Sequence, residues 1–172
     1  MGWQATDTGI AAQPEDPAAD AALRGVLGGL CERPLVQVLS SPGDLDDAYT
    51  LAKAWRRKSD ATVVIGTGGA SLGGQTLVAI APERERVWFL DNIDPDSVSR
   101  MLAAHDLTRL TWLVVSKSGA TVETLSTLMA VYGAYAEAGL GAEFAVRSAV
   151  ITEVPDSPLG QFAAAKAITL FA

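Results

Sequence analysis

Hydroxyl side chains gather in the segment SKSGATVET, residues 116–124. Ser116, Ser118, Thr121 and Thr124 each offer an oxygen atom that can donate a hydrogen bond. A helix that starts near Thr121 would add free backbone amides, which favour an anion at that end. The segment is therefore suited to hold one phosphate dianion without any arginine. The alternative is that Ser118 and Thr121 only cap the helix, as serine and threonine commonly do.

A second candidate is the glycine-rich segment GTGGASLGG, residues 66–74. Glycines at a strand-to-helix turn let the backbone approach a ligand and turn its N–H groups toward an anion. Two nucleotide-binding motifs nearly fit. The dinucleotide motif G-x-G-x-x-G would need glycine at Ser71, and the phosphate-binding loop G-x-x-x-x-G-K-[ST] would need lysine at Gln75. The other explanation is a tight turn whose glycines serve only helix–sheet packing.

Acidic residues follow another apolar run, where paired carboxylates could perform acid–base chemistry. Asp94 precedes Pro95, a position where aspartate commonly caps a helix, whereas Asp91 at a strand end could approach a ligand. We favour structural roles for Asp91, Asn92 and Asp94. His105, in the polar stretch AAHDLTR, is expected to face solvent rather than to act in catalysis.

Short, continuous apolar runs alternate with helix-like segments from residue 61 onward. These strands and helices must position the candidate ligand-binding side chains. Strands are predicted at residues 62–65, 87–90, 110–115, 148–151 and 168–171. Helices are predicted between them at 71–79, 96–104, 121–137 and 158–166. This alternation predicts right-handed βαβ units in a doubly wound α/β fold with a parallel sheet. Ligands bind such sheets at the carboxyl ends of the strands, where both candidate loops fall.

The N-terminal third shows a different pattern. Residues 1–19, acidic and poor in large apolar groups, are predicted to form a flexible arm. Residues 20–60 are predicted to form a helical layer with helices at 20–30 and 44–58, the second capped by Asp44. Residues 61–172 then form the α/β domain.

Composition excludes several classes of function. The 172 residues are 49% hydrophobic and 19% charged, a balance typical of a soluble globular domain. Thirteen basic and 20 acidic residues give a formal net charge of −7, which disfavours binding to nucleic acid or to an anionic membrane surface. One cysteine and one histidine provide neither an intrachain disulfide nor a multi-ligand metal site. With no apolar run approaching 18 residues and no signal-peptide pattern, we expect a cytoplasmic, metal-free protein.

Four segments together resemble the phosphoglucose isomerase family. They are VVIGTGGASLGG (63–74), FLDNIDPDS (89–97), VVSKSGATVETL (114–125) and ITEVPDSPLGQFAAAKAITLF (151–171). The sugar isomerase (SIS) domains of that family carry the similar motifs I-G-x-G-G-S-x-L-G, D-N-x-D-P and S-K-[ST]-x-T-T-x-E-T. The resemblance implies a five-stranded parallel sheet in the order 2-1-3-4-5, preceded by N-terminal helices.

The resemblance also assigns site residues. It implies that the sugar phosphate is held by Ser116, Lys117, Ser118, Thr121 and Thr124, and that Gly68, Gly69 and Ser71 line the sugar side. Two positions depart from the family pattern: Ala70 stands where the family has serine, and Ala120 where it has threonine. Each departure removes a possible hydroxyl contact with the sugar.

The family interconverts glucose 6-phosphate and fructose 6-phosphate by cofactor-free proton transfer. Its catalytic arginine, glutamate, histidine and lysine lie downstream of the matched region, and Glu123 matches a phosphate-loop glutamate instead. We therefore expect a chain that binds a sugar phosphate without catalysis, lacks the second half of the family fold, and forms a homo-oligomer through apolar surface left uncovered. The alternatives are a stand-alone sugar-phosphate sensor or oligomerisation module and, less favoured, a nucleotide-binding protein that uses residues 69–76.

Overall fold

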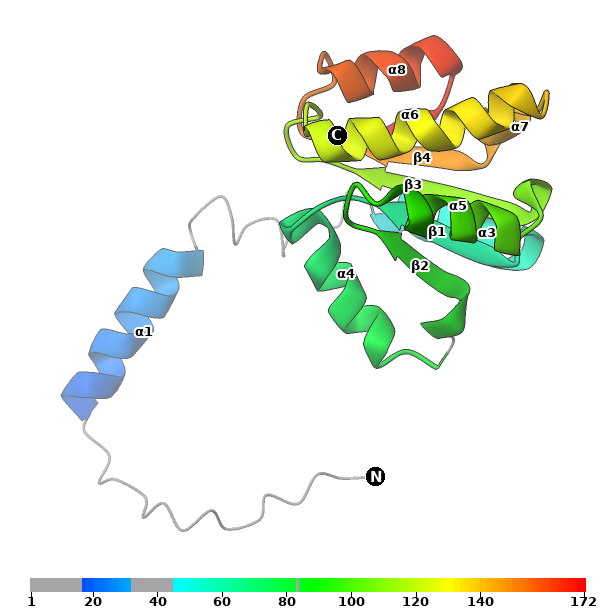
Figure 1. The fold of residues 1–172 in the computed structure, drawn as a ribbon. Helices are drawn as coiled ribbons and strands as arrows, with labels where there is room; N and C mark the ends of the chain where they lie inside the picture. Colours follow the sequence, from blue (N-terminus) through cyan, green and yellow to red (C-terminus); the bar gives the residue numbers. More distant parts are fainter. Residues whose placement is uncertain (1–16, 32–44, 83) are drawn as a thin grey trace. The chain divides into compact units, whose positions relative to one another are not determined.

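The computed structural model describes residues 17–31, 45–82 and 84–172 (Figure 1). Their elements are α1 (Pro17–Cys31), α3 (Leu45–Lys58), β1 (Ala61–Ile65), α4 (Gly69–Ala79), β2 (Val87–Leu90), α5 (Pro95–Ala104), β3 (Leu110–Val115), α6 (Val122–Glu137), α7 (Gly141–Val146), β4 (Ser148–Ile151), α8 (Pro158–Lys166) and β5 (Thr169–Phe171), with 3-10 turns at Arg84–Arg86 and Leu107–Arg109. The chain divides into two compact units, Met1–Asp46 and Asp47–Ala172. The second unit contains the sheet.

All five strands are parallel and follow the order β2-β1-β3-β4-β5, so the predicted fold class and strand order are confirmed. The register aligns Val64 of β1 with Phe89 of β2 on one side and Leu113 of β3 on the other. Because the chain turns from one direction across the sheet to the other between β1 and β3, this pair of strands is the topological switch point, the usual ligand site in such folds.

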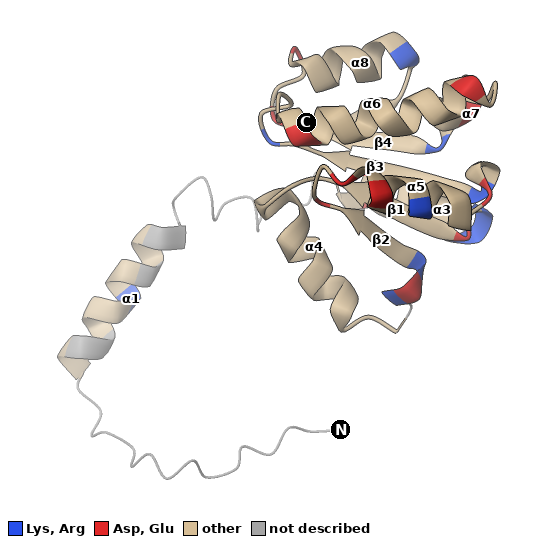
Figure 2. Ribbon diagram, viewed as in Figure 1, with Lys and Arg blue, Asp and Glu red and all other residues tan. Residues whose placement is uncertain are grey.

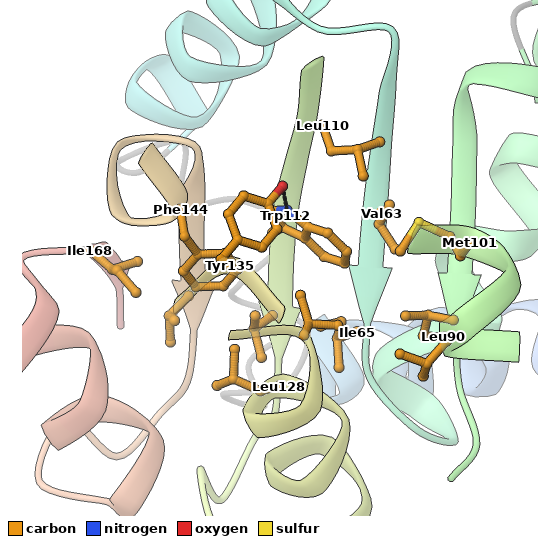
Figure 3. Packing of buried hydrophobic residues seen from close by; sticks show 14 of the residues in the cluster. Val63, Ile65, Leu90, Met101, Leu110, Trp112, Leu128, Tyr135, Phe144 and Ile168 are labelled. Atoms are coloured by element: carbon orange, nitrogen blue, oxygen red, sulfur yellow. Dashed lines mark hydrogen bonds between the residues drawn. The ribbon is translucent and has the colours of Figure 1, made fainter. Parts of the chain in front are cut away.

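One face of the sheet carries the main hydrophobic core, against α5, α6, α7 and α8. Figure 3 shows Trp112 of β3 at its centre, next to Tyr135 of α6 and Phe144 of α7. The indole Nε1 of Trp112 donates a hydrogen bond of 2.8 Å to the Tyr135 hydroxyl. That hydroxyl donates in turn to the Leu107 carbonyl at 2.6 Å. The pair therefore buries two large rings without leaving their polar atoms unsatisfied.

Helix α4 covers the opposite face, where a Cβ atom added to Gly74 would lie 3.3 Å from the ring of Phe89. No residue of α4 is charged, as Figure 2 shows, and only Ser71 of α4 is buried. The helix exposes Leu72 and Leu77, and Ile80, which directly follows it, is 81% exposed. Beyond α4 on the same sheet face, Ile151 of β4 is 39% exposed. Apolar side chains therefore lie exposed on this side of the sheet.

The sequence patterns misplaced a few boundaries. Helix α1 begins at Pro17, inside the predicted arm, because proline is favoured in the first turn of a helix. Residues 1–16 of the arm and Asp44, the predicted cap, lie outside the described residues. The six-residue α7 was not predicted, since one and a half turns show too little periodicity to detect. In the described part of the chain, no helix has the length and hydropathy needed to cross a bilayer.

Candidate functional site

The loops after β1 and β3 lie next to each other at the carboxyl edge of the sheet, because these strands are paired neighbours. Adjacent strands are about 4.8 Å apart. The chain leaves β1 toward α4 on one sheet face and leaves β3 toward α6 on the other. The two candidate segments of the sequence, residues 66–74 and 116–124, are therefore brought together by the topology. We call residues 66–71 the glycine loop and residues 116–121 the hydroxyl loop.

The hydroxyl loop is held in shape by its own side chains. Ser116 is buried, and its Oγ lies 2.9 Å from Thr121 Oγ1 and accepts a hydrogen bond of 3.1 Å from the Gly119 amide. Ser118 is exposed, and its Oγ accepts from the Ala120 amide at 3.3 Å. The three hydroxyls of residues 116, 118 and 121 therefore belong to one short turn, with two of them directly paired.

Gly119 makes this turn possible. Its φ of +62° lies in the left-handed region that favours glycine, and a Cβ atom placed there would overlap Ser157 Oγ at the start of α8. The Leu159 amide donates to the Gly119 carbonyl at 3.0 Å. The hydroxyl loop is thus anchored to α8, and a side chain at position 119 would push the two apart.

Helix α6 starts without a side-chain cap. Thr121 occupies the N-cap position, but its hydroxyl is paired with Ser116 instead of accepting from a helix amide. Within the described residues, the first amide of this helix to find an acceptor is that of Leu125, which donates to the Thr121 carbonyl at 3.0 Å. The alternative that Ser118 and Thr121 serve only as caps of this helix is therefore wrong, and no side chain of the described residues accepts from the amides at the positive end of this 16-residue helix.

Helix α4 also starts without a side-chain cap, although backbone carbonyls accept from its second, third and fourth amides. Gly68, its N-cap, has a φ of +56° and offers no side chain, so no side-chain cap exists. In the described chain the first amide here to find an acceptor is that of Ala70, which donates to the Thr67 carbonyl at 3.2 Å. Gly68 and Gly69 are exposed, as expected for residues on the ligand side.

Helices α5 and α8, by contrast, are capped by their own residues. Asp94 accepts from the Asp96 and Ser97 amides, and Ser157 accepts from the Gly160 amide. A hydrogen bond from the Ser97 hydroxyl is the main cause that lowers the pKa of the Asp94 carboxyl. The predicted capping role of Asp94 is confirmed. Among the helices that directly follow a strand, α4, α5, α6 and α8, the two without a side-chain cap are thus those that flank the switch point; the short α7 also lacks one.

Lys117 extends from the hydroxyl loop into solvent, 3.7 Å from the Glu153 carboxylate. The two backbones are also joined, since the Glu153 amide donates to the Lys117 carbonyl at 3.1 Å. This pair places one cation and one anion beside the start of α6. Lys117 was predicted from the sequence as a site residue. Glu153 was not, because it follows a different strand and no local pattern links it to the hydroxyl loop.

Two predicted site residues are buried. Thr124 is 1% exposed, and its Oγ1 has no hydrogen-bond partner within the described part of the chain. A phosphate would reach that hydroxyl only if the hydroxyl loop moved. Ser71 is also 1% exposed, and its Oγ accepts from Gln75 Nε2 at 2.7 Å. The same Nε2 donates to Asp91 Oδ2 at 2.8 Å.

His105 does not behave as expected. It is half-buried, its ring meets that of Trp88 edge to face at 5.4 Å, and its Nε2 is buried without a partner among the described residues. The prediction that it faces solvent is wrong, because Trp88 at the exposed edge strand β2 covers it. It follows α5 and therefore lies at the amino edge of the sheet, away from the two loops.

Comparison with known proteins adds an independent observation. A family model described as "Phosphoglucose isomerase" matches residues 53–152, more than half of the chain and both loops. A probable glucose-6-phosphate isomerase from Haloquadratum walsbyi is 37% identical over 110 residues, which cover 63% of this chain and 25% of that protein. The chain therefore spans about a quarter of that relative's length.

Solved structures show the same similarity. A hypothetical protein from Thermus thermophilus matches with a TM-score of 0.63 and 30% identity, covering 90% of this chain and 40% of its own. A glucose-6-phosphate isomerase from Chlamydia trachomatis matches with a TM-score of 0.56 and 28% identity, covering 87% of this chain and 26% of its own.

Proposed function

Because the chain belongs to the phosphoglucose isomerase family, we propose that its α/β domain binds a sugar phosphate at the glycine and hydroxyl loops. The observation that carries this proposal is the contrast among the helix starts. Helices α4 and α6 are uncapped at the switch point, whereas α5 and α8 are capped by Asp94 and Ser157. Free amides at the starts of these two helices are suited to an anion.

The hydroxyl loop is the proposed phosphate site. A phosphate dianion there accepts from the first amides of α6 and from the hydroxyls of Ser118 and Thr121, and the Thr121–Ser116 pair supplies a second hydroxyl behind it. Lys117 adds one positive charge at the exposed side. Thr124 joins the site if the loop opens around its unpartnered Oγ1.

The glycine loop is the proposed sugar side. Gly68 and Gly69 expose backbone without side chains, so a ligand can approach their N–H groups closely. Since β1 and β3 are neighbouring strands, the two loops are about one strand spacing apart. An open-chain or cyclic hexose 6-phosphate is long enough to contact both loops at once.

Isothermal titration with fructose 6-phosphate tests this proposal. Thr121→Val, which keeps the shape but removes the hydroxyl, is expected to weaken binding at least tenfold, or about 1.4 kcal/mol, since the lost bond is to a charged group. Thr169→Val on β5 is the matched control, because Thr169 is exposed and far from the hydroxyl loop in the sheet order. The control is expected to bind as the unmodified chain does.

Two results would overturn the proposal. One is unchanged affinity in Thr121→Val. The other is binding of ATP with no binding of sugar phosphates, which would favour the nucleotide-binding alternative. That alternative lacks support from Gln75, which stands where the phosphate-binding loop needs lysine and is bonded to Ser71 and Asp91.

A further inference from the structure

Three side chains behind the glycine loop form a connected group. Gln75 Nε2 of α4 donates to Ser71 Oγ at 2.7 Å and to Asp91 Oδ2 at 2.8 Å. Ser71 lies in the first turn of α4, one turn before Gln75, and Asp91 directly follows β2. We call these residues the Ser71–Gln75–Asp91 triplet. It ties the start of α4 to the neighbouring strand.

The triplet acts on the backbone that the proposed function uses. The Ser71 and Leu72 amides both donate to the Gly68 carbonyl, at 3.0 and 2.9 Å. Gly68 has a positive φ and no side chain, so nothing intrinsic to it holds one conformation. Fixing the Ser71 side chain therefore helps to fix the peptide between Gly68 and Gly69, whose carbonyl accepts these two bonds and whose N–H lies on the proposed sugar side.

The chemistry of the triplet makes it an effective support. Ser71 is 1% exposed, so its Oγ bond is shielded from competing water. The bond from Gln75 to Asp91 is exposed, but its acceptor is charged, and such bonds are shorter and stronger than neutral ones. Helix α4 contains no charged residue that could offer Asp91 another partner.

We propose that Gln75 and Asp91 are positioning residues, which hold the glycine loop in its sugar-binding shape through Ser71 without contacting the ligand. This inference rests on the function proposed above. It assigns separate effects to the two loops. Loss of the triplet lowers the affinity for a sugar phosphate while the affinity of the hydroxyl loop for inorganic phosphate stays the same.

A charge exchange tests the proposal. Gln75→Glu replaces the donor with a second carboxylate facing Asp91 and is expected to weaken fructose 6-phosphate binding at least tenfold. Asp91→Asn alone keeps an acceptor for Gln75 and is expected to change binding less than threefold. In the double variant, the introduced amide can donate to the introduced carboxylate, and binding is expected to return to within threefold of the unmodified chain.

Two further measurements separate positioning from general damage. We expect all three variants to bind inorganic phosphate, measured by NMR titration, as the unmodified chain does. We also expect their midpoints of thermal unfolding to be unchanged. Amide hydrogen exchange at Ser71 and Leu72 is expected to speed up in Gln75→Glu and to return to normal in the double variant. This readout needs no ligand.

Each outcome has a defined meaning. The positioning role is overturned if Gln75→Glu leaves the amide exchange or the sugar-phosphate affinity unchanged. It is also overturned if the double variant fails to restore both. In either case the proposed function stands. If the unmodified chain binds neither fructose 6-phosphate nor inorganic phosphate, the proposed function fails, and the sugar-positioning role is overturned with it.

Discussion

At the scale of single residues, the candidate site depends on neutral donors more than on charge. The chain as a whole has a net charge of −7, and the hydroxyl loop contains one cation, Lys117. Amides at the start of α6 and the hydroxyls of Ser118 and Thr121 carry no net charge, yet they provide directed donors for an anion. Local geometry can therefore outweigh an unfavourable overall charge.

Glu153 is expected to weaken anion binding at this site. Its carboxylate lies 3.7 Å from Lys117 Nζ and pairs with the charge that a phosphate would use. Glu153→Gln is expected to tighten fructose 6-phosphate binding about two- to fourfold, a small effect because an exposed ion pair is worth about 0–1 kcal/mol. Calorimetric titration at low salt measures it, and near 1 M salt the difference is expected to vanish.

Glu143→Gln is the matched control for this change. Glu143 of α7 forms an ion pair of 2.7 Å with Arg147, the residue that follows α7. This pair lies near the amino end of β4, away from the two loops. The control variant has the same charge change and is expected to bind fructose 6-phosphate as the unmodified chain does. Equal affinities in the Glu153 variant and the control would contradict a local effect of Glu153.

At the scale of elements, packing and capping divide the helices into two groups. Of the helices that directly follow a strand, α5 and α8 are capped by Asp94 and Ser157, while α4 and α6 start at the switch point without a side-chain cap. Helix α6 can remain stable with an open start because its buried face is fastened to β3 through Trp112 and Tyr135. Its tertiary contacts offset the missing cap.

The hydrogen bond between Trp112 and Tyr135 makes the free energy of unfolding depend on pH. Tyr135→Phe leaves the buried Trp112 Nε1 without its acceptor and is expected to cost about 1–3 kcal/mol of unfolding free energy at pH 7. Burial raises the pKa of Tyr135 to about 12, above the value near 10 of an unfolded chain. The stabilisation is therefore complete below pH 10 and is lost as the pH rises from 10 toward 12.

Urea unfolding of both proteins at pH 7, 9 and 11 checks this expectation. The advantage of the unmodified chain over Tyr135→Phe is expected to be equal at pH 7 and 9 and smaller at pH 11. Tyr132→Phe is the control, since the Tyr132 hydroxyl makes no hydrogen bond within the described residues. An advantage that persists unchanged at pH 11 would contradict the assigned cause.

At the scale of the whole molecule, α4 leaves apolar side chains exposed on a helix without charges. It exposes Leu72 and Leu77, and Ile80 directly after it is exposed too, while α6 and α7 on the other side of the sheet expose Val122, Met129 and Val146. Ile151 adds to the exposed area on the α4 side of the sheet. Neighbouring exposed apolar side chains of this kind commonly mark an interface.

We expect the chain to self-associate through this surface. Sedimentation velocity is expected to show a dimer or larger species whose share grows with concentration. Leu77→Lys combined with Ile80→Lys is expected to shift the distribution to monomer, because charged side chains resist burial in an apolar contact. The matched control is Lys substitution at Val146, an exposed residue of α7. A monomer at high concentration in the unmodified chain would contradict the expectation.

We also expect the chain alone to give no measurable conversion of glucose 6-phosphate to fructose 6-phosphate. The residues that the two loops supply are donors that bind and orient a ligand, and the reaction also needs a base that takes a proton from carbon. A coupled enzyme assay for fructose 6-phosphate formation checks this expectation. Titration of the same sample with fructose 6-phosphate shows whether it binds the sugar phosphate. Turnover near 1–10³ s⁻¹ would contradict the expectation and direct the search for the base to Glu123 and Asp91.

Much of the fold could be predicted because its signals are local. Each strand is a short apolar run, and the loops after β1 and β3 carry glycines or hydroxyls within a few residues, so a narrow window of sequence contains the information. The doubly wound class, the strand order and the two candidate loops followed from these windows and from the family resemblance. Asp94 was identified as a cap for the same reason, since its partners are two and three residues away.

The details of the site depend on contacts between distant segments. Ser157 leaves no room for a side chain at Gly119, Asp91 accepts a hydrogen bond from Gln75, and the Trp88 ring covers His105. None of these pairs is visible in a local window, because each forms only when separate strands are paired. The sequence by itself determined which groups could donate to an anion. The tertiary structure decided which of them remain free, because it engages Ser71 and buries Thr124 while leaving the starts of α4 and α6 open.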